Sequence, residues 1–213
     1  GFDFWKLKKP GILENNYFTL LAEALSLIRA EKYEEAKLPL KKIIASYPND
    51  ISSTGALRMM AMVHRELGNG TAERKLLVRL ALQDADGLDV NSRLLELEAE
   101  RENWSGVSKY ARRFLAINPL SAKPYRYQAE AFEKTDKTNN AIVAWEKVLL
   151  FDPIDPADVH YRLAILLADA KRPDDARRNA LKALEAAPRF RDAHRLLLKI
   201  AAASKAETEK GSD

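Results

Sequence analysis

Four arginines recur at nearly regular intervals along the chain: Arg58, Arg93, Arg126 and Arg162. A guanidinium group binds a carboxylate through two parallel hydrogen bonds, so a row of such groups would grip an acidic partner. Arginine is also common on exposed helix faces, and Glu96 and Glu130 are near enough in sequence to neutralise these side chains. The sequence leaves both interpretations open.

Other residue patterns that would support chemistry are missing from the sequence. His64, His160 and His194 lie far apart, and none has a metal-ligating partner at helical spacing. No serine or threonine stands in the setting of an activated nucleophile, no glycine-rich loop would cradle a phosphate, and there is no cysteine. We therefore predict no catalytic residue, no cofactor and no metal, and we do not expect an enzyme.

The clearest structural pattern lies in residues 122–155. One helical stripe of buried residue types precedes a polar turn at residues 135–139, and a second stripe follows it before Pro153. Small Ala129 and Ala141 would let the two antiparallel helices approach closely. The larger stripe residues are Tyr125, Phe132, Trp145, Val148 and Leu149.

The same plan repeats along the chain. A proline ends four such hairpins, at Pro48, Pro119, Pro153 and Pro188. An alanine stands twelve residues before three of these prolines, at Ala36, Ala141 and Ala176. A period of about 34 residues built from two helices indicates a stack of helical hairpins.

In this period, in the small residues at the helix crossing and in the terminal proline, the chain resembles the tetratricopeptide repeat (TPR) family over about residues 17–190. The resemblance implies an all-α fold, a right-handed α-solenoid of antiparallel helix hairpins. The expected repeats are 17–50, 54–87, 88–121, 122–155 and 157–190, followed by a capping helix at 191–203. The second repeat departs most, because it lacks the terminal proline and carries Gly68-Asn69-Gly70 at its turn.

The two ends of the chain fall outside these repeats. We expect residues 1–16 to be an N-terminal segment or linker, whose Phe2, Phe4 and Trp5 either touch a preceding domain or fold back on the first repeat. The polar residues 204–213 are expected to be a disordered tail. The sequence begins with glycine, which is expected of a piece of a longer protein.

Composition limits the classes of partner and location. The sequence contains no apolar run of the length needed to span a membrane, and its 46% hydrophobic and 31% charged residues fit a soluble chain of the cytoplasm or the periplasm. The formal net charge is +4, but 35 basic residues are interleaved with 31 acidic ones. This mixture argues against a nucleic-acid-binding stripe.

In a TPR stack the first helix of each hairpin lines the concave side, so the resemblance also implies a partner-binding groove. Its expected residues lie beside the packing stripe of each first helix: Leu21, Leu25, Ile28, Arg58, Met59, Met62, Arg93, Glu96, Arg126, Tyr127, Glu130, Tyr161, Arg162 and Ile165.

Two functions fit these features. The first is a non-enzymatic protein–protein interaction scaffold that holds a peptide or a partner segment in the concave groove. The alternative is an accessory domain that docks to an upstream domain of a larger enzymatic or membrane-anchored polypeptide, or that self-associates through its apolar N-terminal end.

Overall fold

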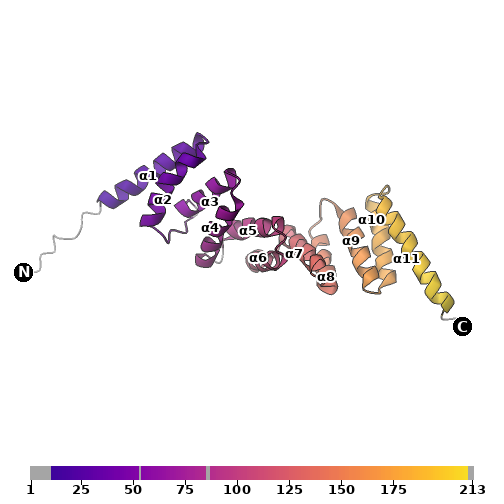
Figure 1. The fold of residues 1–213 in the computed structure, drawn as a ribbon. Coiled ribbons are helices and arrows are strands. Elements are labelled where there is room, and N and C mark those ends of the chain that lie inside the picture. The colour runs from indigo at the N-terminus through magenta and orange to yellow at the C-terminus, as the bar shows by residue number, and fades with distance from the viewer. Residues whose placement is uncertain (1–10, 53, 85–86, 211–213) are drawn as a thin grey trace, which may run out of the picture. The chain divides into compact units, whose positions relative to one another are not determined.

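The structure, a computed structural model, describes residues 11–52, 54–84 and 87–210, and the side chains of residues 16–203 within these ranges. The expected contact of Phe2, Phe4 and Trp5 with the first repeat lies outside the described residues. Within the described ranges the chain forms eleven α-helices (Figure 1). Their bounds are α1 Gly11–Arg29, α2 Tyr33–Ser46, α3 Ala56–Glu66, α4 Gly70–Gln83, α5 Leu88–Glu100, α6 Trp104–Ile117, α7 Ala122–Lys134, α8 Thr138–Leu149, α9 Pro156–Asp169, α10 Pro173–Ala186 and α11 Arg191–Lys210.

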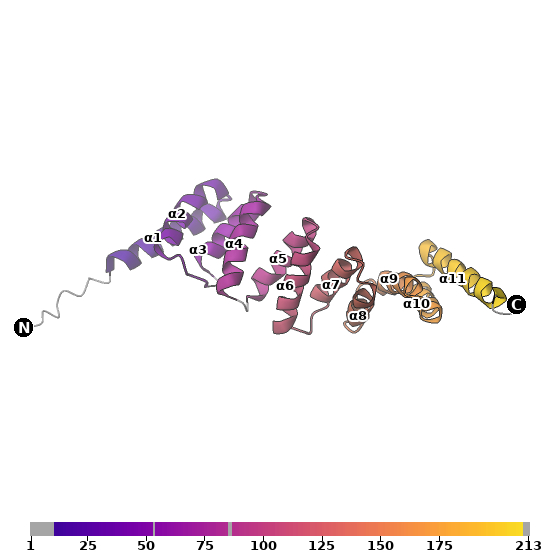
Figure 2. The ribbon, with the colours of Figure 1, turned by 60° about the horizontal axis from the view of Figure 1, so that its bottom comes forward.

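Consecutive helices pack as antiparallel pairs, and this arrangement confirms the all-α, TPR-like fold (Figure 2). The chain divides into two compact units, Gly1–Leu97 and Glu98–Asp213. Each unit has a core of its own: Leu40, Ile43 and Met60 belong to the first, whereas Trp145 and Leu163 belong to the second.

Small residues allow the close helix crossing in three hairpins. The alanine pairs Ala24 and Ala36, Ala129 and Ala141, and Ala164 and Ala176 are each separated by twelve residues, and all six side chains are fully buried. A methyl group takes little space between two helix axes, so larger side chains fill the volume around the crossing. In the fourth hairpin these are Trp145, which is fully buried, and the partly buried Tyr125 and Phe132.

The second hairpin breaks this rule. Ala61 occupies the crossing position of α3, but the residue twelve positions later is Glu73, whose side chain is only 3% exposed. A buried carboxylate needs a cationic partner, and the sequence pattern of one hairpin does not supply it. The partner is Arg93 of α5, described below.

Each turn between paired helices contains one residue in the left-handed backbone region. These residues lie seven positions after the crossing residue of the first helix: Glu31, Gly68, Glu102, Asp136 and Lys171. Their φ values lie between 54° and 69°. Only Gly68 adopts this conformation without steric cost, which explains the glycine-rich turn that sets the second repeat apart.

Both ends of the helical array extend beyond the expected bounds. Helix α1 begins at Gly11 instead of near residue 17, and α11 continues to Lys210 instead of ending at residue 203. The structure thus describes residues 204–210 as part of α11, within the segment expected to be a disordered tail. Alanine, lysine and glutamate are strong helix formers, and no glycine interrupts them before Gly211. Among the described helices, none is long and apolar enough to cross a membrane.

The turn geometry predicts different effects for two neighbouring glycines. Gly68→Ala places a Cβ at φ +69° and is expected to lower the free energy of unfolding by about 1 kcal/mol. Gly70→Ala, the matched control, lies at the start of α4, where an added Cβ makes an ordinary 3.7 Å contact with Leu97 Cδ2. It should be neutral or stabilising. Urea unfolding of both variants tests the assignment, and equal stability of the two would contradict it.

Candidate functional site

The structure places every predicted groove residue on the first helix of its hairpin. In the first unit Leu21, Leu25 and Ile28 lie on α1, followed by Arg58, Met59 and Met62 on α3, and by Arg93 and Glu96 on α5. In the second unit α7 carries Arg126, Tyr127 and Glu130, and α9 carries Tyr161, Arg162 and Ile165. All of these side chains are half-buried. In the first unit Leu21, Ile28 and Met59 pack against the core, so part of the predicted groove is the edge of the core.

The four arginines do not form one row of equivalent positions. Arg58 and Arg126 precede the crossing residue of their helix by three positions, whereas Arg93 and Arg162 precede it by two. Neighbouring positions on a helix are rotated by about 100°, so the two pairs point in different directions. Each pair makes its own kind of contact.

The first kind of contact reaches forward to the next hairpin. Arg58 of α3 binds Asp84 at 3.2 Å and also pairs with Asp89 in the first turn of α5. Arg126 of α7 binds Asp158 at 3.3 Å in the first turn of α9, the position that corresponds to Asp89. The same ion pair therefore joins successive first helices in both units.

The second kind of contact reaches back to the preceding hairpin. Arg93 donates two hydrogen bonds, of 2.7 and 3.0 Å, to the buried Glu73 carboxylate of α4 and a third, of 3.0 Å, to Glu96. Arg162 of α9 donates to Glu133 of α7 at 3.4 Å and to Asp158 of its own helix at 3.0 Å.

In the second unit these contacts converge on one buried aromatic ring. The guanidinium groups of Arg126 and Arg162 lie 5.7 and 5.3 Å from the ring of Trp145, within the range of cation–π attraction. The indole Nε1 of Trp145 donates a hydrogen bond to Glu133. Arg126 also donates two hydrogen bonds, of 2.8 and 2.9 Å, to Asp155 at the start of α9. We call this set the tryptophan cluster: Trp145, Arg126, Arg162, Glu130, Glu133, Asp155 and Asp158.

Carboxylates outnumber guanidinium groups in the tryptophan cluster by four to two. Burial raises the pKa of Glu130 above its ordinary value of 4.5, against the opposing effect of Arg162 and Arg126. The hydrogen bond from Arg126 lowers the pKa of Asp155 below 3.8.

All four arginines of the chain's predicted row are already paired with carboxylates, so their geometry favours a role in joining hairpins over gripping an acidic partner.

Two hollows lie beside the tryptophan cluster. The first, the acidic recess, has a volume of about 220 Å³ and is lined by Glu133, Asp158, Tyr161, Arg162, Ile165 and Leu166. The second, the terminal cleft between α9 and α11, has a volume of about 700 Å³. Its apolar lining is Tyr161, Ile165, Ala168, Leu196, Ile200 and Ala203. Tyr161 and Ile165 line both hollows, so the two adjoin each other along α9.

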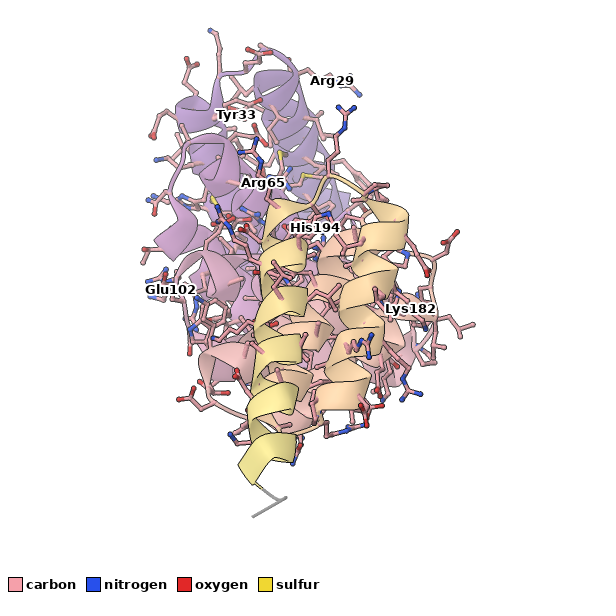
Figure 3. The ribbon with its side chains drawn as sticks, turned by 90° about the vertical axis from the view of Figure 1, so that its right-hand side faces the viewer. Arg29, Tyr33, Arg65, Glu102, Lys182 and His194 are labelled. Atoms are coloured by element: carbon pink, nitrogen blue, oxygen red, sulfur yellow. The ribbon has the colours of Figure 1, made fainter. Side chains whose placement is uncertain are left out.

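The histidines have structural surroundings. His160 shares a hydrogen bond of 2.9 Å with Asn179, and His194 Nε2 lies 2.9 Å from the carbonyl oxygen of Pro188. Figure 3 shows His194 in the first turn of α11 beside α10, which carries Lys182. Burial lowers the pKa of His64. Among the described residues, no group of three His, Asp or Glu side chains is arranged to hold a metal ion.

Sequential antiparallel hairpins with a hollowed first-helix face define a helical-repeat scaffold. The tetratricopeptide repeat family model matches residues 19–50. This match covers one hairpin, and the sequential antiparallel hairpins of the described residues have a TPR-like fold. Domains of this family typically mediate protein–protein interactions.

Solved structures share the fold at low sequence identity. The chain is similar to YrrB, described as a TPR protein with an unusual peptide-binding site, with 16% identity over 86% of this chain and 94% of that one and a TM-score of 0.67. It is also similar to the MamA protein, with 16% identity over 81% and 92% of the two chains and a TM-score of 0.65. For MamA from Desulfovibrio magneticus RS-1 the identity is 16%, the coverage 80% and 94%, and the TM-score 0.60. No curated protein matches the chain by sequence.

The buried pair of Glu73 and Arg93 predicts a non-additive response to mutation. Arg93→Met leaves the Glu73 carboxylate buried without its partner and should destabilise the first unit by about 3 kcal/mol. Adding Glu73→Ala restores the alanine of the other crossings and should recover most of this loss. Urea unfolding of the two single variants and the double variant measures the coupling. Additive effects would show that the pair is not a unit.

The lowered pKa of Asp155 predicts a pH-dependent contribution to stability. A carboxyl group with a depressed folded-state pKa stabilises the fold above its unfolded pKa, and this stabilisation is lost as the pH falls through the folded-state pKa. Asp155→Asn should therefore lower the free energy of unfolding by about 1 kcal/mol at neutral pH, since the pair is partly exposed.

Thermal unfolding as a function of pH measures this effect. The difference between Asp155→Asn and the wild type should shrink as the pH falls below about 4. Asp152→Asn, an exposed carboxylate of the same loop with no partner among the described residues, is the matched control and should behave as the wild type at each pH. A difference that stays constant down to low pH would contradict the assignment.

Proposed function

We propose that the chain is a non-enzymatic scaffold that binds a peptide or an unfolded segment of a partner protein on the first-helix face of its hairpins. The observation that carries this proposal is the terminal cleft, an apolar hollow of about 700 Å³ between α9 and α11. Its size falls in the range of ligand sites, and one of its walls is α9, the first helix of the last hairpin.

The surroundings of the terminal cleft favour the binding of a partner over a role in packing within the fold. Leu196 and Ile200 of α11 reach the core of the second unit, yet they also line the cleft with Ile165 of α9. An apolar surface that lines a hollow among the described helices of the unit is a candidate for a partner's apolar side chains. The resemblance to YrrB adds weight, since that protein shares the fold and has a peptide-binding site.

The proposal predicts that a charge in the cleft abolishes binding. Ile165→Lys places a cation where Tyr161, Leu196 and Ile200 offer apolar surface. Leu198→Lys adds the same charge to the exposed side of α11, where Leu198 is 73% exposed, and serves as the matched control. Helical content and thermal unfolding of both variants should remain close to those of the wild type.

The measurement has two stages. A partner is first captured from an extract of the source cells by the wild type and identified, and its binding segment is then synthesised and titrated against each variant. We expect the wild type and Leu198→Lys to bind this peptide with similar affinity and Ile165→Lys to lose about tenfold or more. Equal binding of the peptide by all three proteins would show that the cleft is not the binding site. A partner that binds only as an intact folded protein would favour a docking domain instead.

A further inference from the structure

We infer that the acidic recess and the terminal cleft together select a partner segment that carries a basic side chain next to large aliphatic side chains. This inference rests on the proposed function and specifies the chemistry of the partner. It is the opposite of one of the two interpretations that the sequence left open, in which a row of arginines draws an acidic partner into the groove.

The first step is that the two hollows adjoin each other along α9. Tyr161 and Ile165, one helical turn apart on α9, line both the recess and the cleft. A segment that lies along this face of α9 therefore presents neighbouring side chains to both hollows. One side chain faces Glu133 and Asp158, and the next faces Leu196 and Ile200.

The charge balance of the recess is the second step. Its walls carry the carboxylates of Glu133 and Asp158 and the single guanidinium group of Arg162. Behind them, Arg126 is shared among Glu130, Asp155 and Asp158, so the tryptophan cluster as a whole has two unbalanced negative charges. A lysine or arginine side chain of a partner would neutralise part of this excess, whereas a carboxylate would add to it.

The charged lining of the terminal cleft does not compete for the basic side chain. It carries three basic and two acidic side chains: Lys171, Arg195, Lys199, Asp169 and Asp192. Arg195 pairs with Asp192 at 3.3 Å, whereas Lys171 and Lys199 have no ion-pair partner among the described residues. The surplus charge of the cleft lining is therefore positive. A basic side chain is drawn to the recess and not to the cleft, which gives the bound segment one preferred direction.

A pair of synthetic peptides tests this charge preference on the whole chain. Both peptides have the same leucine-containing body and differ only at one end, which carries either two lysines or two glutamates. Binding is measured by fluorescence anisotropy at low and at high salt. The wild type should bind the lysine peptide about tenfold more tightly than the glutamate peptide, and added salt should reduce the difference.

The variant Glu133→Gln isolates the contribution of the recess. It keeps an oxygen that can accept the hydrogen bond of Trp145 Nε1 and removes one negative charge from the wall. It should weaken binding of the lysine peptide about fivefold and leave the glutamate peptide unchanged or slightly improved. Glu146→Gln, which removes an exposed carboxylate from α8 of the same unit, is the control and should change neither affinity.

The outcomes separate the charge preference from the proposed function. Equal binding of both peptides, with both lost in Ile165→Lys, would overturn the charge preference while the cleft remained a peptide site. Failure of both peptides to bind would overturn this inference. The proposed function would then be decided by the titration of the captured partner's own segment. A concentration-dependent dimer that is lost in Ile165→Lys would assign the cleft to a second copy of the chain and would also overturn the inference.

Discussion

The close crossing of the two helices in each hairpin is the constraint on which the rest of the structure depends. At Ala24 and Ala36, and at Ala129 and Ala141, fully buried methyl groups occupy the crossing. The crossing fixes the rotation of the first helix, and with it the face that packs and the face that stays open. The turn residue seven positions later takes the left-handed conformation in all five hairpins, even where a side chain makes this costly.

The helices were predictable because they depend on local periodicity. A stripe of apolar residues at spacings of three and four identifies a helix and its packing side, so the residues beside that stripe were correctly placed on first helices. The ion pairs were not predictable in this way. Whether an arginine reaches forward, as Arg126 does to Asp155, or back, as Arg93 does to Glu73, depends on a shift of one position relative to the crossing and on carboxylates from another hairpin. The sequence did contain one signal of such a pair. Glu73 is a charged residue at a position where the other crossings have small or apolar residues.

This pairing with carboxylates changes the role that can be assigned to the arginines. A guanidinium group with two carboxylate partners has few donors left and would lose those partners before binding a new one. In the tryptophan cluster Arg126 and Arg162 lie over Trp145 and connect α7 to α9, so their principal role is to hold successive hairpins together. The charge available to a partner is then the excess of carboxylates that these arginines do not neutralise.

In the proposed site, binding and stability would be coupled through Glu133. Its carboxylate accepts hydrogen bonds from Trp145 of α8 and from Arg162 of α9, and it also forms one wall of the acidic recess. A partner cation that approaches Glu133 shares a carboxylate already oriented by the fold, so little side-chain entropy is lost on binding. The same cation adds a positive charge near Arg162, whose remaining carboxylate partner, Asp158, lies on the opposite wall. A segment that contacts both walls neutralises both carboxylates at once, and it gains more than one that reaches either wall alone.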